Sequence, residues 1–171
     1  MATGDSLLFA LTLATALGCG LMAGFFFAFS VAVMKALARL PAREGMAAMN
    51  SINVVVINPL FLTVLLGTAV ACVLVIISAL VRWHNPGAIW LLVGGALYLV
   101  GSFLVTAVFN VPKNNALAAV DPASTDGARV WASYVTSWTA WNHVRTVAAL
   151  VAAALLTIAL CGARALTLGA P

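Results

Sequence analysis

The sequence contains very few charged residues. Only 7% of its 171 residues are charged, whereas 64% are hydrophobic, and the mean hydropathy is +1.14. A soluble domain carries roughly 25% charged residues, because water must wet its surface. So little charge cannot cover a globule of this size in water. The composition therefore predicts an integral membrane protein whose main partner is the lipid bilayer.

Basic patches and cofactor motifs are also missing. The eight Lys and Arg residues stand singly between apolar segments, which argues against nucleic acid as a partner. No phosphate loop, nucleophile elbow or metal-binding motif occurs in the sequence. Cys19, Cys72 and Cys161 lie inside apolar runs without a CxxC pair, so we interpret all three as small buried hydrophobic residues.

Two long uncharged runs occupy the first half of the chain. The first, from Ser6 to Met34, is much longer than a signal-peptide core and predicts a retained first span over about residues 7–34. The second exceeds one membrane crossing, and we divide it at Asn58-Pro59, a pair typical of a helix start. This division predicts an interfacial helix at about residues 42–57 and a second span at about 60–81.

The second half contains two further spans, predicted at about residues 88–109 and 141–161. We expect the last helix to begin earlier, at a cap formed by Ser124 or Thr125, and to continue unbroken into its span. Because a backbone in lipid must satisfy its own hydrogen bonds, all spans should be helices. The predicted fold over residues 1–171 is one all-α, four-transmembrane-helix bundle, with an interfacial helix in the first loop and a loop-side extension of the fourth helix.

The positive charges predict an orientation. One group flanks the first and third loops, namely Lys35, Arg39, Arg43, Lys113 and Arg129. Only Arg82 and Arg164 flank the other side. By the positive-inside rule, the first and third loops are cytoplasmic and both termini lie outside.

The last helix carries an aromatic and polar stripe. At about 100° per residue, one arc of roughly 100° contains Trp131, Tyr134, Trp138, Trp141, Asn142 and Arg145. An Arg near the start of an apolar span is costly if it faces lipid, so Arg145 is expected to face the bundle and bind polar partners. The alternative is that Arg145 extends to the headgroups while the aromatic residues form an interfacial belt.

Three other helices carry matching patterns. Ser102, Thr106 and Asn110 share one face of the third span, which leads to Asn114 and Asn115. The interfacial helix carries Met46, Met49, Asn50 and Asn53 on one arc. In the first span, Gly20, Gly24 and Ala28 form a row of small residues that predicts close helix packing, either within one bundle or between protomers of a homo-oligomer.

His143 points roughly 100° away from the stripe, and we weigh a general base against an interfacial residue. A haem or copper site using Met46, Met49 and His143 is a further reading. It is difficult to build from one His on each side of the membrane, but it stays open.

Four segments resemble the anthrone oxygenase family of small four-helix membrane proteins, which is largely a domain of unknown function in bacteria. They are residues 24–30 (GFFFAFS), 58–61 (NPLF), 110–117 (NVPKNNAL) and 138–146 (WTAWNHVRT). The resemblance implies a bacterial plasma membrane and the oxidation of a lipophilic anthrone-like or quinol-like substrate. Dioxygen would be the co-substrate, and no cofactor is required.

The resemblance also implies roles for particular residues. Arg145 would stabilise an enolate, His143 would be the base, and Trp138 and Trp141 would stack on the rings. The amide side chains of Asn110, Asn114 and Asn142 would bind the substrate's oxygens. The remaining site residues, which are Asn115, Tyr134, Asn50 and Asn53, would line the pocket. The rival function is a non-enzymatic membrane module that binds or transports a lipophilic ligand and uses Arg145 as an anchor.

Overall fold

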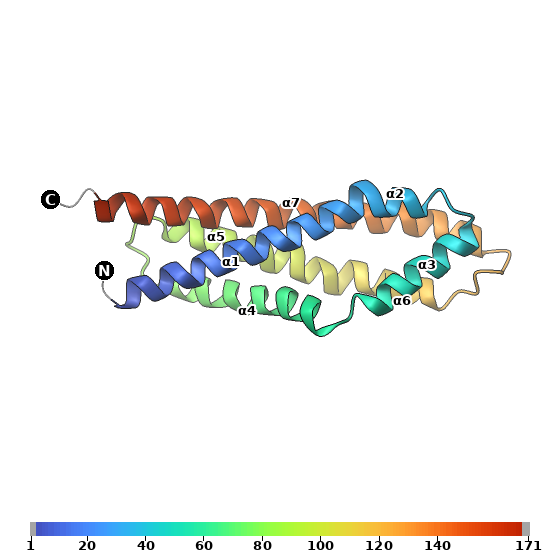
Figure 1. The fold of residues 1–171 in the computed structure, drawn as a ribbon, viewed down its shortest axis with the longest axis horizontal. Helices are drawn as coiled ribbons and strands as arrows, with labels where there is room; N and C mark the ends of the chain where they lie inside the picture. Colours follow the sequence, from blue (N-terminus) through green and yellow to red (C-terminus); the bar gives the residue numbers. More distant parts are fainter. Residues whose placement is uncertain (1–2, 169–171) are drawn as a thin grey trace.

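The structure, a computed structural model, describes the backbone of residues 3–168 and the side chains of residues 4–162. All regular structure in this part is helical. Four helices are long and apolar enough to cross a membrane: Gly4–Leu37, Pro59–Val81, Ala88–Ala118 and Gly127–Gly162. They lie side by side along the long axis of the molecule, with both termini at one end (Figure 1). The predicted all-α, four-span architecture is confirmed.

The first and last helices are longer than the predicted spans. The first consists of α1 (Thr3–Ala28), a wide π turn η1 (Phe29–Val33) and α2 (Met34–Leu37). The last, α7 (Gly127–Leu168), runs the full length of the bundle (Figure 1). The extension of the fourth helix is therefore confirmed. Its start is not the predicted one, because Asp126 rather than Ser124 or Thr125 precedes its first turn.

Asn58 separates the interfacial helix α3 (Ala42–Val55) from the second span α4 (Pro59–Val81) as predicted. Its Oδ1 accepts a hydrogen bond from the Phe61 amide at 3.0 Å, and its Nδ2 donates to the Val55 carbonyl at 3.0 Å. One side chain thus caps the start of α4 and the end of α3. Because α4 begins part-way along the bundle, α3 lies beside the other helices at the end away from the termini, hereafter the cap end (Figure 1).

The sequence predicted that the third span ends at about residue 109, but the helix continues beyond this point. It continues from α5 (Ala88–Leu97) through two π turns, η2 (Tyr98–Leu104) and η3 (Thr106–Asn110), into α6 (Val111–Ala118). Pro112 lies in the first turn of α6. A proline inside a helix removes one backbone donor and crowds the preceding turn. The wide turn η3 directly before it lets the helix pass the proline instead of stopping there.

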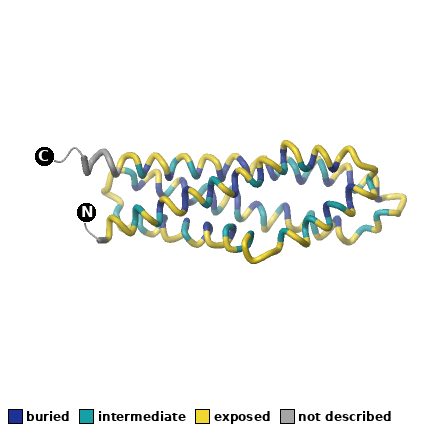
Figure 2. The backbone as a smooth tube through the Cα atoms, viewed as in Figure 1, coloured by how far each residue is buried: buried dark blue, intermediate teal, exposed yellow. Residues whose placement is uncertain are grey.

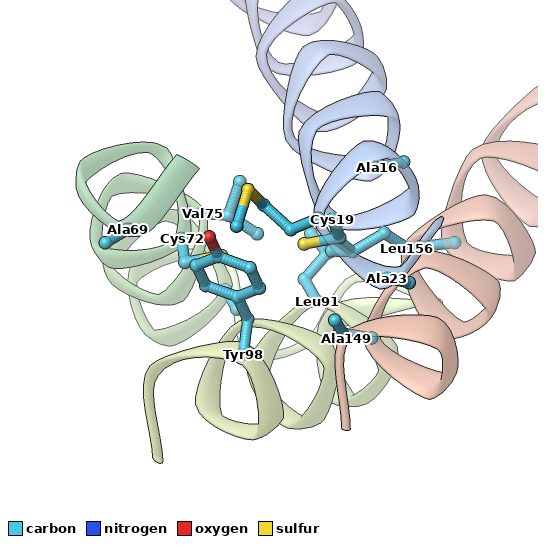
Figure 3. Packing of buried hydrophobic residues seen from close by; sticks show 14 of the residues in the cluster. Ala16, Cys19, Ala23, Ala69, Cys72, Val75, Leu91, Tyr98, Ala149 and Leu156 are labelled. Atoms are coloured by element: carbon cyan, nitrogen blue, oxygen red, sulfur yellow. The ribbon is translucent and has the colours of Figure 1, made fainter. Parts of the chain in front are cut away.

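The buried positions lie along the inner faces of the helices (Figure 2). Two hydrophobic clusters fill the bundle. The larger lies toward the termini and is built on Cys19, Cys72, Tyr98 and their neighbours (Figure 3), and the Tyr98 hydroxyl donates to the Leu65 carbonyl at 3.2 Å. The second, at the cap end, comprises Met34, Leu37, Met46, Met49, Leu117, Trp131, Tyr134 and Trp138. Cys19 and Cys72 are buried as predicted. Cys161 is exposed, because it lies on the outer face of α7, where an apolar side chain meets lipid rather than a neighbouring helix.

The row of small residues on α1 does not pack within this chain. A Cβ added at Gly20 or Gly24 would meet no heavy atom of the described residues within 4 Å, and Ala28 is exposed. The within-bundle interpretation is therefore wrong. Gly18 makes the close contact instead, because a Cβ there would overlap the hydroxyl of Thr68 on α4.

The charges separate by end, as the sequence suggested. The five basic residues of the first and third loops belong to the segments at the cap end. Arg82 lies at the opposite end and pairs with Asp5 at 2.7 Å. The side chain of Arg164 lies outside the described residues. Which end faces the cytoplasm stays a prediction.

Candidate functional site

A layer of polar side chains separates the two hydrophobic clusters. On the first helix it contains Ser30, on the third helix Thr106 and Asn110, and on α7 Asn142 and Arg145. On each helix these residues lie between the positions that belong to one cluster and those that belong to the other. We call these five residues the polar layer. Polar groups at such a depth in a membrane bundle are costly and usually functional.

Arg145 is the centre of the layer, and its side chain is only 4% exposed. Its Nη2 donates to Asn142 Oδ1 at 2.6 Å and its Nη1 to Thr106 Oγ1 at 3.2 Å. The guanidinium carbon lies 4.3 Å from the ring centre of Phe26 and 5.0 Å from that of Trp138. Arg145 therefore faces inward, as the amphipathic stripe predicted, and does not extend to the headgroups.

Asn142 sets the direction of the guanidinium. Its Nδ2 donates to the Phe26 carbonyl at 2.7 Å and to Ser30 Oγ at 2.6 Å. With its amide nitrogen directed at the first helix, its carbonyl oxygen must point at Arg145. Asn142 is completely buried, so this arrangement is shielded from water. It thus joins α1 and η1 to the arginine on α7.

Arg145 has no acidic partner among the described side chains. The chain contains four acidic residues. Asp5 pairs with Arg82 and Asp126 with Arg129, while Glu44 and Asp121 are exposed. The partners of Arg145 are thus an amide, a hydroxyl and two aromatic rings, all of them neutral. A buried cation normally requires a counter-charge, so this site is electrostatically suited to an anion.

Several buried polar atoms in and around the layer make no hydrogen bond within the described part of the chain. They are Arg145 Nε, Asn110 Oδ1, Ser102 Oγ, Thr139 Oγ1, Asn50 Oδ1 and Asn53 Nδ2. Asn110 does donate through Nδ2 to the Trp138 carbonyl at 3.2 Å. Native proteins satisfy nearly all buried polar groups, so such a set indicates a place for water or a ligand.

The cap-end aromatic residues are held by one amide. Asn114 Oδ1 accepts from the Tyr134 hydroxyl at 2.8 Å and from Trp138 Nε1 at 2.7 Å. The rings of Trp131, Tyr134 and Trp138 stack in sequence. Asn53 on α3 lies beside the Tyr134 hydroxyl. The structure therefore brings the predicted site residues Asn114, Tyr134, Trp138 and Asn53 together next to the polar layer.

Other predicted site residues lie elsewhere. Trp141 stacks on Phe109, with ring centres 3.6 Å apart and planes at 7°, at the edge of the stripe. His143 and Asn115 are exposed. Met46 and Met49 are buried in the cap-end cluster, so the structure does not bring them together with His143. Among the described residues, no three His, Cys, Asp or Glu side chains are grouped so that they could hold a metal ion.

Sequence reasoning missed the contribution of the first helix. Phe26 stacks on the guanidinium and Ser30 accepts from Asn142, and these two residues are spaced i, i+4 within the segment 24–30. That spacing was visible, but nothing in the sequence shows which face of the helix meets α7. The wide turns were missed as well. Ser30 lies in η1, and Thr106 and Asn110 lie in η3, and single π turns are frequent at functional sites.

The fold and the site define a class: a small four-helix membrane protein with a buried, positively charged polar layer between its two hydrophobic clusters. Comparison with known proteins identifies the family. A family model described as anthrone oxygenase matches residues 48–155, which is more than half of the chain. The chain therefore belongs to the anthrone oxygenase family. The matched region includes Asn110, Asn142 and Arg145 and leaves out Phe26 and Ser30. No curated protein and no solved structure matches the chain.

Proposed function

We propose that the protein is a membrane-embedded oxidoreductase that oxidises a lipophilic aromatic substrate, anthrone-like or quinol-like, with dioxygen. The observation that carries this proposal is the neutral surrounding of the buried Arg145 guanidinium. A cation at this depth raises the free energy of the empty protein unless an anion joins it. An enolate or phenolate formed from the substrate would supply that anion.

The chemistry of an anthrone fits such a site. Its methylene group, flanked by two aromatic rings, loses a proton to a base or to water and becomes an electron-rich enolate. The enolate carbon reduces dioxygen and forms a C–O bond, which gives a hydroperoxide after protonation. Loss of one water from the hydroperoxide leaves the quinone carbonyl. The methylene carbon is oxidised, dioxygen is reduced, and the products are one quinone and one water.

The residues of the polar layer would act on the first step. Arg145 would stabilise the negative oxygen of the enolate and so make the methylene more acidic. Asn142 is a positioning residue, because it holds the guanidinium and has no free donor of its own. The unpaired Oδ1 of Asn110 would accept a hydrogen bond from a substrate hydroxyl. His143 is exposed and outside the layer, so this proposal gives it no contact with the substrate.

The test is oxygen consumption and quinone absorbance with the purified protein in lipid nanodiscs. Several anthrones and quinols should be oxidised faster than in empty nanodiscs. Arg145→Lys should lower turnover about 100-fold or more, the usual effect of losing a group that stabilises a transition-state oxyanion. Lysine cannot bind Asn142 and Thr106 in one plane while lying flat between two rings. No acceleration across the whole panel would refute the enzymatic proposal.

A second candidate is a non-enzymatic protein that binds or transports a lipophilic anion. The same neutral environment of Arg145 favours it, because binding an anion needs no chemistry. The two functions differ in the products. An enzyme yields quinone and consumes oxygen, whereas a binding protein retains the ligand unchanged, and mass spectrometry of the extracted ligand separates them.

A further inference from the structure

An open groove of about 500 Å³ lies between α1, α3 and α4, and the guanidinium of Arg145 does not line it. It is located where α3 ends and α4 begins. Its walls include Phe25 and Phe29 from the first helix, Ser51 and Ile52 from α3, and Phe61 and Val64 from α4. Its volume falls within the roughly 300–1,000 Å³ of small-molecule sites. Because the surrounding medium of these helices is lipid, the groove is reached from within the bilayer.

A chain of aromatic rings connects this groove to the polar layer. The ring centre of Phe25 lies 5.1 Å from that of Phe61 and 4.9 Å from that of Phe29. The Phe29 ring in turn lies 5.9 Å from that of Trp138, which contacts the Arg145 guanidinium. Phe29 therefore lines the groove with one side and touches the wall of the site with the other.

The character of the lining selects the occupant. Inside a bilayer, leaving the lipid gives an apolar molecule no hydrophobic gain, so binding depends on packing and ring contacts. Aromatic faces at stacking distance favour a rigid flat ring system over a flexible acyl chain, which loses more conformational freedom on binding. A neighbouring groove of about 310 Å³ between α1 and α4 offers a contrast. It shares Leu21 and Val64 but is lined by aliphatic and small residues without a ring.

We propose that the larger groove is where a planar aromatic substrate enters from the bilayer and binds, with Phe29 as the partition that separates it from the polar layer. This proposal rests on the proposed function for the identity of the substrate. The ring system binds against Phe25 and Phe61. Displacement of the Phe29 side chain then brings the ring against Trp138 and its oxygen to Arg145.

Photolabelling with anthraquinone, a flat three-ring quinone, tests the location. On illumination, its excited carbonyl abstracts hydrogen from a nearby C–H bond, and the two radicals combine into a covalent adduct. With the full chain in nanodiscs, peptide mass spectrometry should find adducts concentrated in residues 21–29 and 51–64. Adducts spread evenly over the lipid-facing helices, or concentrated near Trp141, would overturn the proposal.

Filling the groove provides the matched comparison. Ser51→Trp places an indole in the groove from an exposed position and should reduce labelling there at least fivefold. Ala47→Trp, one turn earlier on α3 and outside the groove, should leave labelling unchanged, as should Ala14→Trp in the smaller groove. Val55→Trp is the substitute if Ser51→Trp does not fold. Labelling that is insensitive to both filling variants would also overturn the proposal.

The test of the groove as a binding site can fail or succeed independently of the test of the proposed oxidase activity. Arg145→Met should leave the labelling pattern in place, because the guanidinium does not line the groove. Labelling in the groove without any acceleration of oxidation would retain the binding site and refute the enzyme. Oxidation without labelling in the groove would retain the enzyme and refute this site.

Discussion

Replacing Thr106 with Asp would place a carboxylate where Arg145 Nη1 now meets a neutral hydroxyl at 3.2 Å. The site would then contain its own counter-ion. If the function of Arg145 depends on a cation without an acidic partner, this variant should bind an anionic intermediate poorly, although every other residue of the layer is kept. Thr106→Asn is the matched control, because asparagine has nearly the same shape as aspartate and lacks its charge.

The expected loss of turnover in the Asp variant follows from the distance between the two charges. Two unit charges about 4 Å apart attract by about 4 kcal/mol at an effective dielectric constant of roughly 20. A single charged hydrogen bond contributes about 2 kcal/mol, which sets a lower bound. At 1.4 kcal/mol per factor of ten, the Asp variant should oxidise its substrate roughly 30- to 1,000-fold more slowly than the Asn variant. Its thermal stability should equal or exceed that of the Asn variant, because the buried guanidinium gains an ionic partner.

The assay compares both variants in nanodiscs by oxygen uptake at pH 7 and pH 9, where the new carboxylate is ionised beside the guanidinium. Thermal unfolding followed by circular dichroism provides the stability comparison. Turnover of the Asp variant within about threefold of the Asn variant at pH 9 would refute the reasoning, because an internal counter-ion would then be harmless.

Three further predictions concern a single side chain each. His143→Gln should keep turnover within about twofold and leave its pH profile unchanged, because the imidazole is exposed outside the layer; a loss of tenfold or more would restore His143 as the base. Asn58→Ala should lower the free energy of unfolding by about 1 kcal/mol in chemical denaturation, as expected for a lost helix cap, and Asn58→Ser should recover most of it. Gly18→Ala should destabilise the bundle by about 1–3 kcal/mol, because its Cβ would overlap Thr68, whereas Gly24→Ala should be neutral; equal melting temperatures for the two would contradict this packing.

The position of α4 links the fold to the site. Because Asn58 and Pro59 start this helix part-way along the bundle, the fourth place at the cap end is taken by α3, which brings its own amides toward Tyr134. The same junction leaves the groove open between α1, α3 and α4. A single capping pair in the sequence thus creates both the cover over the polar layer and the opening beside it.

Much of the architecture followed from local features of the sequence. The four spans depend on run length and composition, and the junction at Asn58 depends on the chemistry of one side chain. The inward face of α7 followed from helical periodicity, because Arg145 and Asn142 occur on the same arc as the buried aromatic residues. Each of these inferences needs only one helix, and the period of a helix is the same wherever it packs.

The tertiary structure alone decided which faces meet. Phe26 and Ser30 became partners of α7 only through the rotation of the first helix, and the same rotation turned Gly24 outward. The π turns shifted the register of the third helix so that Thr106 reaches the guanidinium. Trp141, which was expected in the substrate site, lies on Phe109. Rotation and register are set by side chains from several helices packing at once, so no single segment encodes them. The sequence by itself determined a membrane bundle with an inward arginine, and only the packed helices decided that this arginine has neutral neighbours.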